Sequence, residues 1–108
     1  MDKKFYSLLG LARKAGKVVL GYDNILKKKK AAKLLILSCS ASERTVRNVT
    51  YLEKPVIRLD INMEEFGRLM GASQVAVAAV TDDNFAEKLT IICCKGVINE
   101  REFKIQST

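Results

Sequence analysis

The stretch GYDNILKKKKAAKLLILS, from Gly21 to Ser38, contains in order a glycine, two residue types that cap helices, a run of lysines and a run of apolar residues. Asp23 and Asn24 have side-chain oxygens that accept hydrogen bonds from the free N–H groups of a first helical turn. They predict a helix that starts at about Asp23, with its positive dipole end open to phosphate or to a polar base edge. The apolar run Leu34–Ser38 predicts a strand that is covered on both faces.

The helix that starts near Asp23 runs into a segment dominated by lysine. Five of the seven residues from Lys27 to Lys33 are lysine. Because a helix cannot bury so many ammonium groups, we expect most of this segment to lie at the surface. The residues of this helix that we expect to face inward are Tyr22, Ile25, Leu26 and Ala32.

Four other segments have the apolar spacing of helices. In the first, Phe5, Leu8, Leu9, Ala12 and Ala15 share one helical face, and Gly16 ends it. Each of the later three has a capping signal at its start: Ser40 with Glu43, Asn62 with Glu65, and the pair Asp82 and Asp83. Their expected inward residues are Val46, Val49 and Leu52, then Phe66, Leu69 and Met70, then Phe85, Ala86, Leu89, Ile92 and Cys93. We expect Pro55, Gly71 and Gly96 to end these three helices.

Short apolar runs between the helices predict strands at Val18–Leu20, Leu34–Ser38, Val56–Leu59 and Val75–Val80. Helices that alternate with short strands indicate a sheet with helices on both faces. The sequence therefore predicts an α/β fold, a three-layer α/β/α sandwich that is a single small domain with a central mixed sheet of about four strands. We expect the domain to cover residues 1–95, and we leave the structure of the C-terminal tail, residues 96–108, open.

The distribution of charge favours a polyanionic partner. Residues 1–58 hold 14 Lys and Arg against 4 Asp and Glu, a net +10, whereas residues 59–108 hold 5 against 8, a net −3. Segregated charge of this kind is typical of a face held toward nucleic acid. The alternative is a basic half that is merely solvated. A membrane surface is less favoured, because no helix pairs its lysines with a large aromatic face.

The residues offer little for catalysis or metal binding. The chain has no histidine, the commonest general base and metal ligand. Its three cysteines, two of them adjacent, form neither a zinc pattern nor a disulfide framework, which favours a reducing cytosol. No glycine-rich phosphate loop is present. We expect a cytoplasmic, non-enzymatic protein with no metal, cofactor or small-molecule substrate. Its apolar runs are too short to span a membrane, and no signal peptide is visible.

RNA is the polyanion that the composition favours. Only 6% of the residues are aromatic, so stacking along a single strand is less expected than recognition of a structured RNA shape. Cationic side chains would position its phosphates. The residues that we expect to do so are Lys27, Lys28, Lys30, Lys33, Arg44 and Arg47.

Six segments of the chain resemble, in order, the kink-turn RNA-binding superfamily that contains the ribosomal L7Ae and L30e proteins, in particular its small bacterial YlxQ-type branch. They are LLGLARKAGKVVLG (8–21), KAAKLLILS (30–38), SERTVRN (42–48), KPVIRL (54–59), FGRLMGASQVAVAAVTD (66–82) and FAEKL (85–89). The resemblance covers residues 5 to about 90. It implies an α/β/α sandwich and an RNA binder that is not an enzyme.

The resemblance also implies two RNA-contacting segments. The first is the family's G-x-N-E-x-x-K motif, which enters the groove of a kink-turn and contacts its tandem G·A pairs. Its positions here are Gly21, Asp23, Asn24 and Lys27, with Tyr22 between them. The family's Asn and Glu are thus replaced, and an Asp can only accept hydrogen bonds, where an Asn also donates them. The second segment is the loop of Gly71, Ala72, Ser73, Gln74 and Val75.

Two hypotheses follow. The first is a non-catalytic RNA-binding protein, ribosomal or ribosome-associated, that recognises a structured, kink-turn-like RNA. The second is a protein-interaction module of the same fold that has lost specific RNA recognition. Asp23 and Asn24 in the motif, and the acidic second half of the chain, are the reasons to keep the second hypothesis.

Overall fold

The structure is a computed structural model that describes residues 3–96. The predicted tail, residues 96–108, lies outside the described residues except for Gly96. The elements in chain order are α1 (Lys3–Lys14), β1 (Val18–Leu20), α2 (Tyr22–Lys27), β2 (Leu34–Leu37), α3 (Glu43–Thr50), β3 (Val56–Arg58), α4 (Met63–Met70), β4 (Val77–Val80) and α5 (Asp83–Gly96).

The four strands form one mixed sheet in the order β1-β4-β2-β3. Strand β4 pairs antiparallel with both β1 and β2, and β2 pairs parallel with β3. All four residues of β2 and all four of β4 are buried, as expected for the two inner strands. The predicted mixed sheet of about four strands is confirmed.

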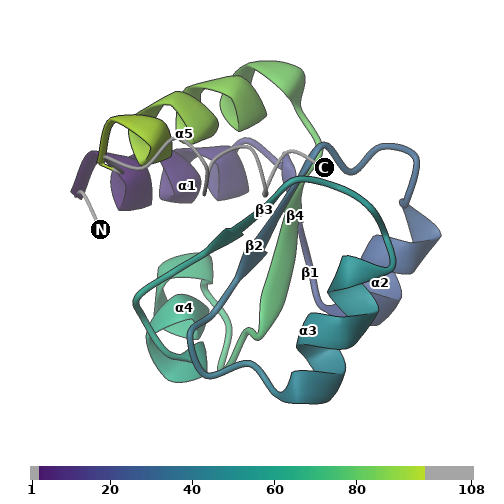
Figure 1. The fold of residues 1–108 in the computed structure, drawn as a ribbon. Helices are drawn as coiled ribbons and strands as arrows, with labels where there is room; N and C mark the ends of the chain where they lie inside the picture. The colour runs from purple at the N-terminus through teal and green to yellow at the C-terminus, as the bar shows by residue number, and fades with distance from the viewer. Residues whose placement is uncertain (1–2, 97–108) are drawn as a thin grey trace.

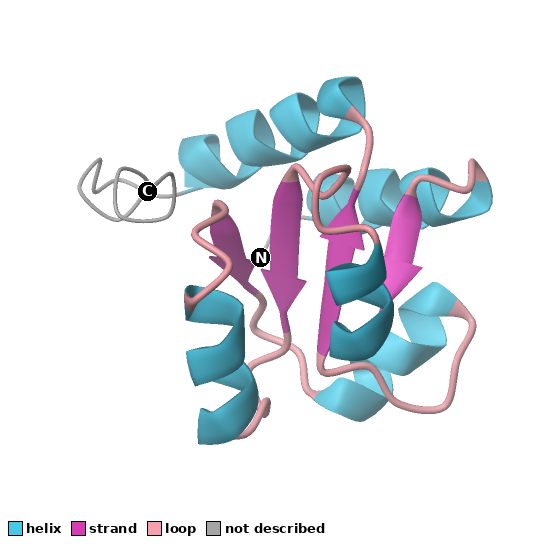
Figure 2. Ribbon diagram, turned by 90° about the vertical axis from the view of Figure 1, so that its right-hand side faces the viewer, coloured by secondary structure: helices cyan, strands magenta, loops and turns pink. Residues whose placement is uncertain are grey.

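Helices cover both faces of this sheet, and each face has its own core (Figures 1 and 2). On one face, α1, α4 and α5 pack through residues such as Phe5, Phe66 and Leu89. On the other, α2 and α3 pack through Ile25 and Val49. Figure 2 looks onto the sheet with α2 and α3 in front of it. The predicted three-layer α/β/α sandwich is confirmed.

Helix α2 differs most from its prediction. It starts at Tyr22 instead of Asp23, with Gly21 as its N-cap and no side-chain cap, and it ends at Lys27. Lys28, Lys29 and Lys30, which follow, lie in turns instead of on a helix. A longer helix would stack like charges three and four residues apart, and the chain must return to the sheet to bury Ala32. Leu26, predicted to face inward, is 43% exposed.

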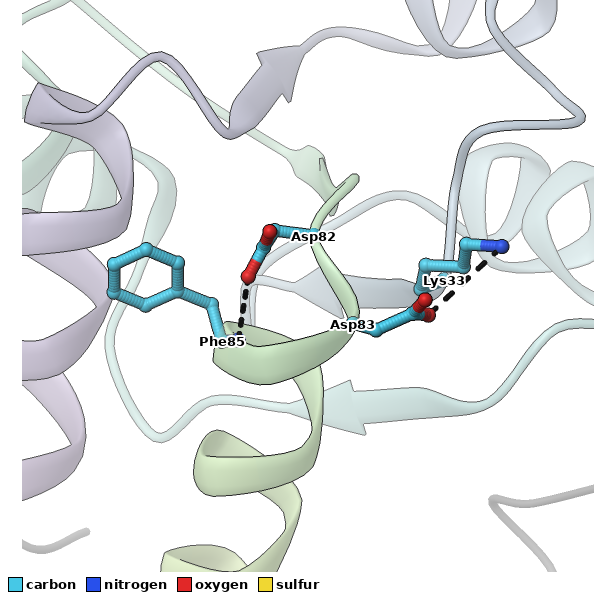
Figure 3. A network of polar contacts seen from close by, with 4 residues as sticks. All are labelled: Lys33, Asp82, Asp83 and Phe85. Carbon is cyan, nitrogen blue, oxygen red and sulfur yellow. Dashed lines mark hydrogen bonds and ion pairs between the residues drawn. The ribbon is translucent and has the colours of Figure 1, made fainter.

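The capping signals are confirmed at two helices and wrong at one. Asn62 and Glu65 form a complete capping box at α4. Asp82 accepts a hydrogen bond from the Phe85 N–H at the start of α5, 3.0 Å away (Figure 3). At α3, however, the cap is Ser42, which accepts from the Thr45 N–H.

Ser40, the predicted cap of α3, serves another helix. Its hydroxyl accepts a hydrogen bond from the N–H of Met63, the first residue of α4, 3.0 Å away. Strand β2 ends at Leu37, and the chain uses residues 38–41 to turn before α3 can begin.

Smaller differences concern the ends of elements. Ala15 lies beyond the end of α1 and is exposed, and β4 begins two residues later than Val75. Helix α3 ends at Thr50, well before Pro55, and β3 ends at Arg58 instead of Leu59.

The end of α4 and the loop after it are held in place by hydrogen bonds from Arg13 and by a close backbone contact at Gly67. The Arg13 side chain of α1 donates hydrogen bonds to the carbonyls of Met70 and Val18, at 3.1 and 3.3 Å. Gly67 lies under the loop that follows α4. A Cβ atom on Gly67 would lie 2.6 Å from the Ser73 carbonyl oxygen. Because this oxygen belongs to the backbone, it could move away only if the loop moved with it. The loop after α4 therefore keeps its position only because residue 67 has no side chain.

We predict that Gly67→Ala lowers the free energy of unfolding by about 1–3 kcal/mol, the usual cost of overpacking, as measured by urea denaturation. Gly10→Ala is the matched control, because Gly10 is also inside a helix. A Cβ atom there would lie 3.9 Å from Leu69, an ordinary contact. Since alanine favours helix by up to about 1 kcal/mol over glycine, this control is expected to be neutral or stabilising. Equal effects at the two positions would contradict the close approach.

Candidate nucleic-acid interface

The predicted RNA-contacting segments meet at one end of the sheet. Strands β1 and β2 end there and β4 begins there, as their antiparallel pairing requires. A hollow of about 310 Å³ lies at this end. It is lined by Leu20, Gly21, Tyr22, Thr45, Ala72, Gln74, Val75, Ala76 and Val77. Residues far apart in the sequence, from the start of α2, the first turn of α3 and the loop after α4, thus form one surface.

The start of α2 is fixed by its backbone. The Gly21 N–H donates to the Val77 carbonyl of β4 at 3.0 Å, so the first residue after β1 is still tied to the sheet. Gly21 has φ 85° and ψ 144°, a combination that residues with a Cβ avoid. The Asn24 side-chain N–H donates to the Leu20 carbonyl at 2.9 Å, while Asp23 is exposed in the first turn.

The loop Gly71–Val75 is held on both sides. Gly71 caps α4 in the left-handed conformation, and the Ala72 N–H donates to the Gly67 carbonyl at 2.8 Å. The Val75 N–H donates to the Met63 carbonyl at 3.0 Å, and its side chain is buried. Ser73 and Gln74 at the tip of the loop are exposed, and Gln74 lines the hollow. The loop presents a polar tip on a fixed apolar base.

The head of α3 forms a third wall of the hollow. Thr45, which contributes this wall, was not predicted as a site residue. Its position follows from the Ser42 cap, since a cap places the residue three positions later in the first turn. Arg44 and Arg47 are exposed on α3, and neither lines the hollow itself.

The lysines lie apart from the hollow. Lys27, Lys28 and Lys30 surround a second concavity of about 460 Å³, together with Leu26, Lys29 and Ala31. We call residues 26–31 the lysine turn. It follows the C-terminal end of α2, and the six residues of that helix span roughly 9 Å at 1.5 Å per residue. The hollow and the lysine turn therefore lie at opposite ends of α2.

Lys33 lies still farther away, at the opposite end of the sheet. Its N–H donates to the carbonyl of Val80, the last residue of β4, at 2.8 Å. Its ammonium group lies 3.9 Å from the Asp83 carboxylate (Figure 3). The structure thus places fourteen of the fifteen predicted site residues on or near α2, α3 and the loop after α4, and separates Lys33 from them.

This surface carries several kinds of polar group. It offers backbone and amide donors, an exposed carboxylate at Asp23, and cations on two sides. Within residues 3–96, no three His, Cys, Asp or Glu side chains are grouped to hold a metal ion. No helix in the same range is both long enough and apolar enough to cross a membrane.

Known proteins resemble this chain along most of its length. The model of the ribosomal protein L7Ae/L30e/S12e/Gadd45 family matches residues 3–99. "RNA-binding protein YlxQ" of Bacillus subtilis (strain 168) is 38% identical over 92 residues, which cover 80% of this chain and 91% of that protein. A solved structure of a protein with unknown function from Bacillus halodurans C has a TM-score of 0.71 and 27% identity, and the match covers 84% of this chain and 97% of that one.

We predict that Gly21→Asn lowers the free energy of unfolding by about 1–3 kcal/mol, the cost of a strained backbone conformation. Gly71→Asn is the matched control. A Cβ atom at either glycine would have open space around it, so only the backbone conformation differs. Gly71 is left-handed, with φ 76° and ψ 33°, a conformation that Asn tolerates. Urea denaturation should show a clearly smaller loss for Gly71→Asn, and the reverse order would refute this account of Gly21.

Proposed function

The chain belongs to the ribosomal protein L7Ae/L30e/S12e/Gadd45 family, and on this basis we propose that it is a non-catalytic RNA-binding protein that recognises a structured, kink-turn-like RNA. The observation that carries the proposal is the hollow. It joins the start of α2 to the loop Gly71–Val75, the two segments that the family resemblance implies as RNA contacts. An RNA that reaches one segment would therefore also meet the other.

The shape of the hollow suits an RNA with an exposed, bent groove. Residues at the end of the sheet line it together with Gln74, Thr45 and the start of α2. Because backbone hydrogen bonds fix the α2 start and the loop, binding would require little reordering of the protein, which favours affinity.

Asp23 and Asn24 determine which base edge the motif can read. The exposed Asp23 carboxylate only accepts hydrogen bonds, and a guanine presents N–H donors that match it. One N–H of Asn24 is already used by the Leu20 carbonyl, which leaves its second N–H and its oxygen for the RNA. We propose that Asp23 accepts from a guanine and that Asn24 serves first to hold the α2 start.

The cations would contact phosphates on two sides of this centre. Lys27, Lys28 and Lys30 lie in the lysine turn, and Arg44 and Arg47 lie on α3. Such contacts position an RNA without reading its sequence, and they weaken as salt rises. We leave Lys33 out of the proposed interface, because it lies at the far end of the sheet and pairs with Asp83.

We further propose that the protein acts in the cytoplasm as a ribosomal or ribosome-associated factor. The family is named for ribosomal proteins, and the Bacillus subtilis relative is named an RNA-binding protein. Asp23 also supports a second candidate, a protein-interaction module, because an exposed carboxylate in the first turn of α2 repels phosphates.

We predict that a labelled kink-turn RNA binds at least about tenfold more tightly than the same RNA with both G·A pairs replaced, a difference of about 1.4 kcal/mol. Fluorescence anisotropy titrations would measure both. Lys27→Ala should weaken binding of the intact RNA, since it removes a cation from the α2 end of the interface. Lys33→Ala and Lys88→Ala remove the same charge from exposed positions elsewhere and should have much smaller effects.

Each alternative has its own result in these titrations. Equal binding to both RNAs that fades with salt would reduce the site to a basic patch. No binding to either RNA would favour the protein-interaction module. Equal losses for all three lysine variants would show that net charge, instead of the α2 surface, carries the affinity.

A further inference from the structure

Tyr51 is the most exposed large apolar side chain among the described residues, at 75%. The other described aromatic residues are buried, as Phe5 and Phe66 are, or half-buried, as Tyr6, Tyr22 and Phe85 are. Because a tyrosine ring is large and mostly apolar, exposing it to water forgoes stability that burial would give. Folding alone therefore does not explain why the Tyr51 side chain is exposed.

Tyr51 lies on the same face of α3 as two arginines. Arg44, Arg47 and Tyr51 are spaced by three and four residues, which places them in one row along the helix. We call these three residues the α3 ridge. All three are exposed, and neither arginine has an ion-pair partner within residues 3–96. The ridge is about 10 Å long at 1.5 Å per residue.

The ridge begins in the same turn of α3 as Thr45, a residue of the hollow. Arg44 is next to Thr45 in this turn, whereas Tyr51 is the C-cap residue at the opposite end of α3. The backbone of Tyr51 is fixed, because its N–H donates to the Arg47 carbonyl at 3.2 Å and its φ and ψ are helical. A strand that leaves the hollow along α3 would meet Arg44, then Arg47, then the ring of Tyr51.

The chemistry of the ridge favours nucleic acid over protein. Two unpaired guanidinium groups followed by an exposed aromatic ring match a strand of phosphates that ends in an unstacked base. Glu43 lies four residues before Arg47 on the same helix face but forms no ion pair with it within residues 3–96, and Glu53 follows Tyr51 in the turn after α3. A protein contact would need a wider apolar area around Tyr51, and the residues beside it, Thr50 and Glu53, are exposed and polar.

We propose that the α3 ridge binds a single-stranded flank of the RNA that the hollow recognises, with Arg44 and Arg47 on successive phosphates and the Tyr51 ring stacked on an unpaired base. The inference rests on the proposed function and adds a second, sequence-tolerant contact to it.

Three RNAs test this proposal by anisotropy: the folded element alone, and the same element with four unpaired uridines added at its 5′ or its 3′ end. One extension should tighten binding by about fivefold to 150-fold, the range that stacking of one base on an aromatic ring covers. Tyr51→Ala should abolish this gain and leave binding of the bare element unchanged. Tyr51→Phe should keep the gain, because the ring remains.

Leu11→Ala is the matched control, since Leu11 is 56% exposed on α1, which packs on the other face of the sheet. It should leave the gain intact. Replacing both Arg44 and Arg47 by Gln should lower the salt dependence of the extended RNA, by about 1.4 in the slope of log K against log salt for two single-strand phosphates. A 5-iodouridine in the extension should crosslink to Tyr51 under ultraviolet light.

The outcomes separate the two proposals. If the bare element binds but neither extension tightens binding, or if Tyr51→Ala keeps the gain, the ridge proposal is overturned and the proposed function stands. If the bare element does not bind at all, the proposed function fails, and the ridge proposal fails with it.

Discussion

Strand β4 is the element on which the rest of the molecule depends. It pairs with β1 on one side and β2 on the other, and its alternate residues enter the two cores, Ala78 and Val80 on one face and Val77 and Ala79 on the other. Its ends also accept hydrogen bonds from outside the sheet, from Gly21 at the start and from Lys33 at the end. The position of β4 therefore determines where the hollow lies and where the chain at Lys33, at the opposite end of the sheet, lies.

The geometry of the candidate interface is set by packing between residues outside the interface itself. The loop after α4 rests on Gly67, and α4 is in turn tied to α1 through the hydrogen bond from Arg13 to Met70. The start of α2 is tied to β4 instead of to its own side chains. Polar groups of the interface thus rest on elements whose places are fixed by the cores, which is the arrangement that keeps a binding site organised before its ligand arrives.

Much of the fold could be predicted from the sequence, and less of the site. Buried runs such as Leu34–Leu37 and the Asn62–Glu65 capping box are local signals, so they identified strands and helix starts correctly. The end of α2 and the role of Ser40 depend on where the chain must go next, which no local pattern contains. Lys33 belongs by sequence to the lysine run, but strand pairing carries it to the opposite end of the sheet. Thr45 joins the hollow only through tertiary structure.

Helix α2 has a single buried residue, Ile25, and six residues in all. A helix so short is not stable alone, so the sheet must hold it in place. Tyr22 is half-buried against the same core, and the other four residues of the helix are exposed. Substitutions at exposed positions such as Asp23 therefore cost the cores little, yet they change the groups that the surface offers to a ligand. The family resemblance implies Asn and Glu where this chain has Asp23 and Asn24, and both of these positions are exposed.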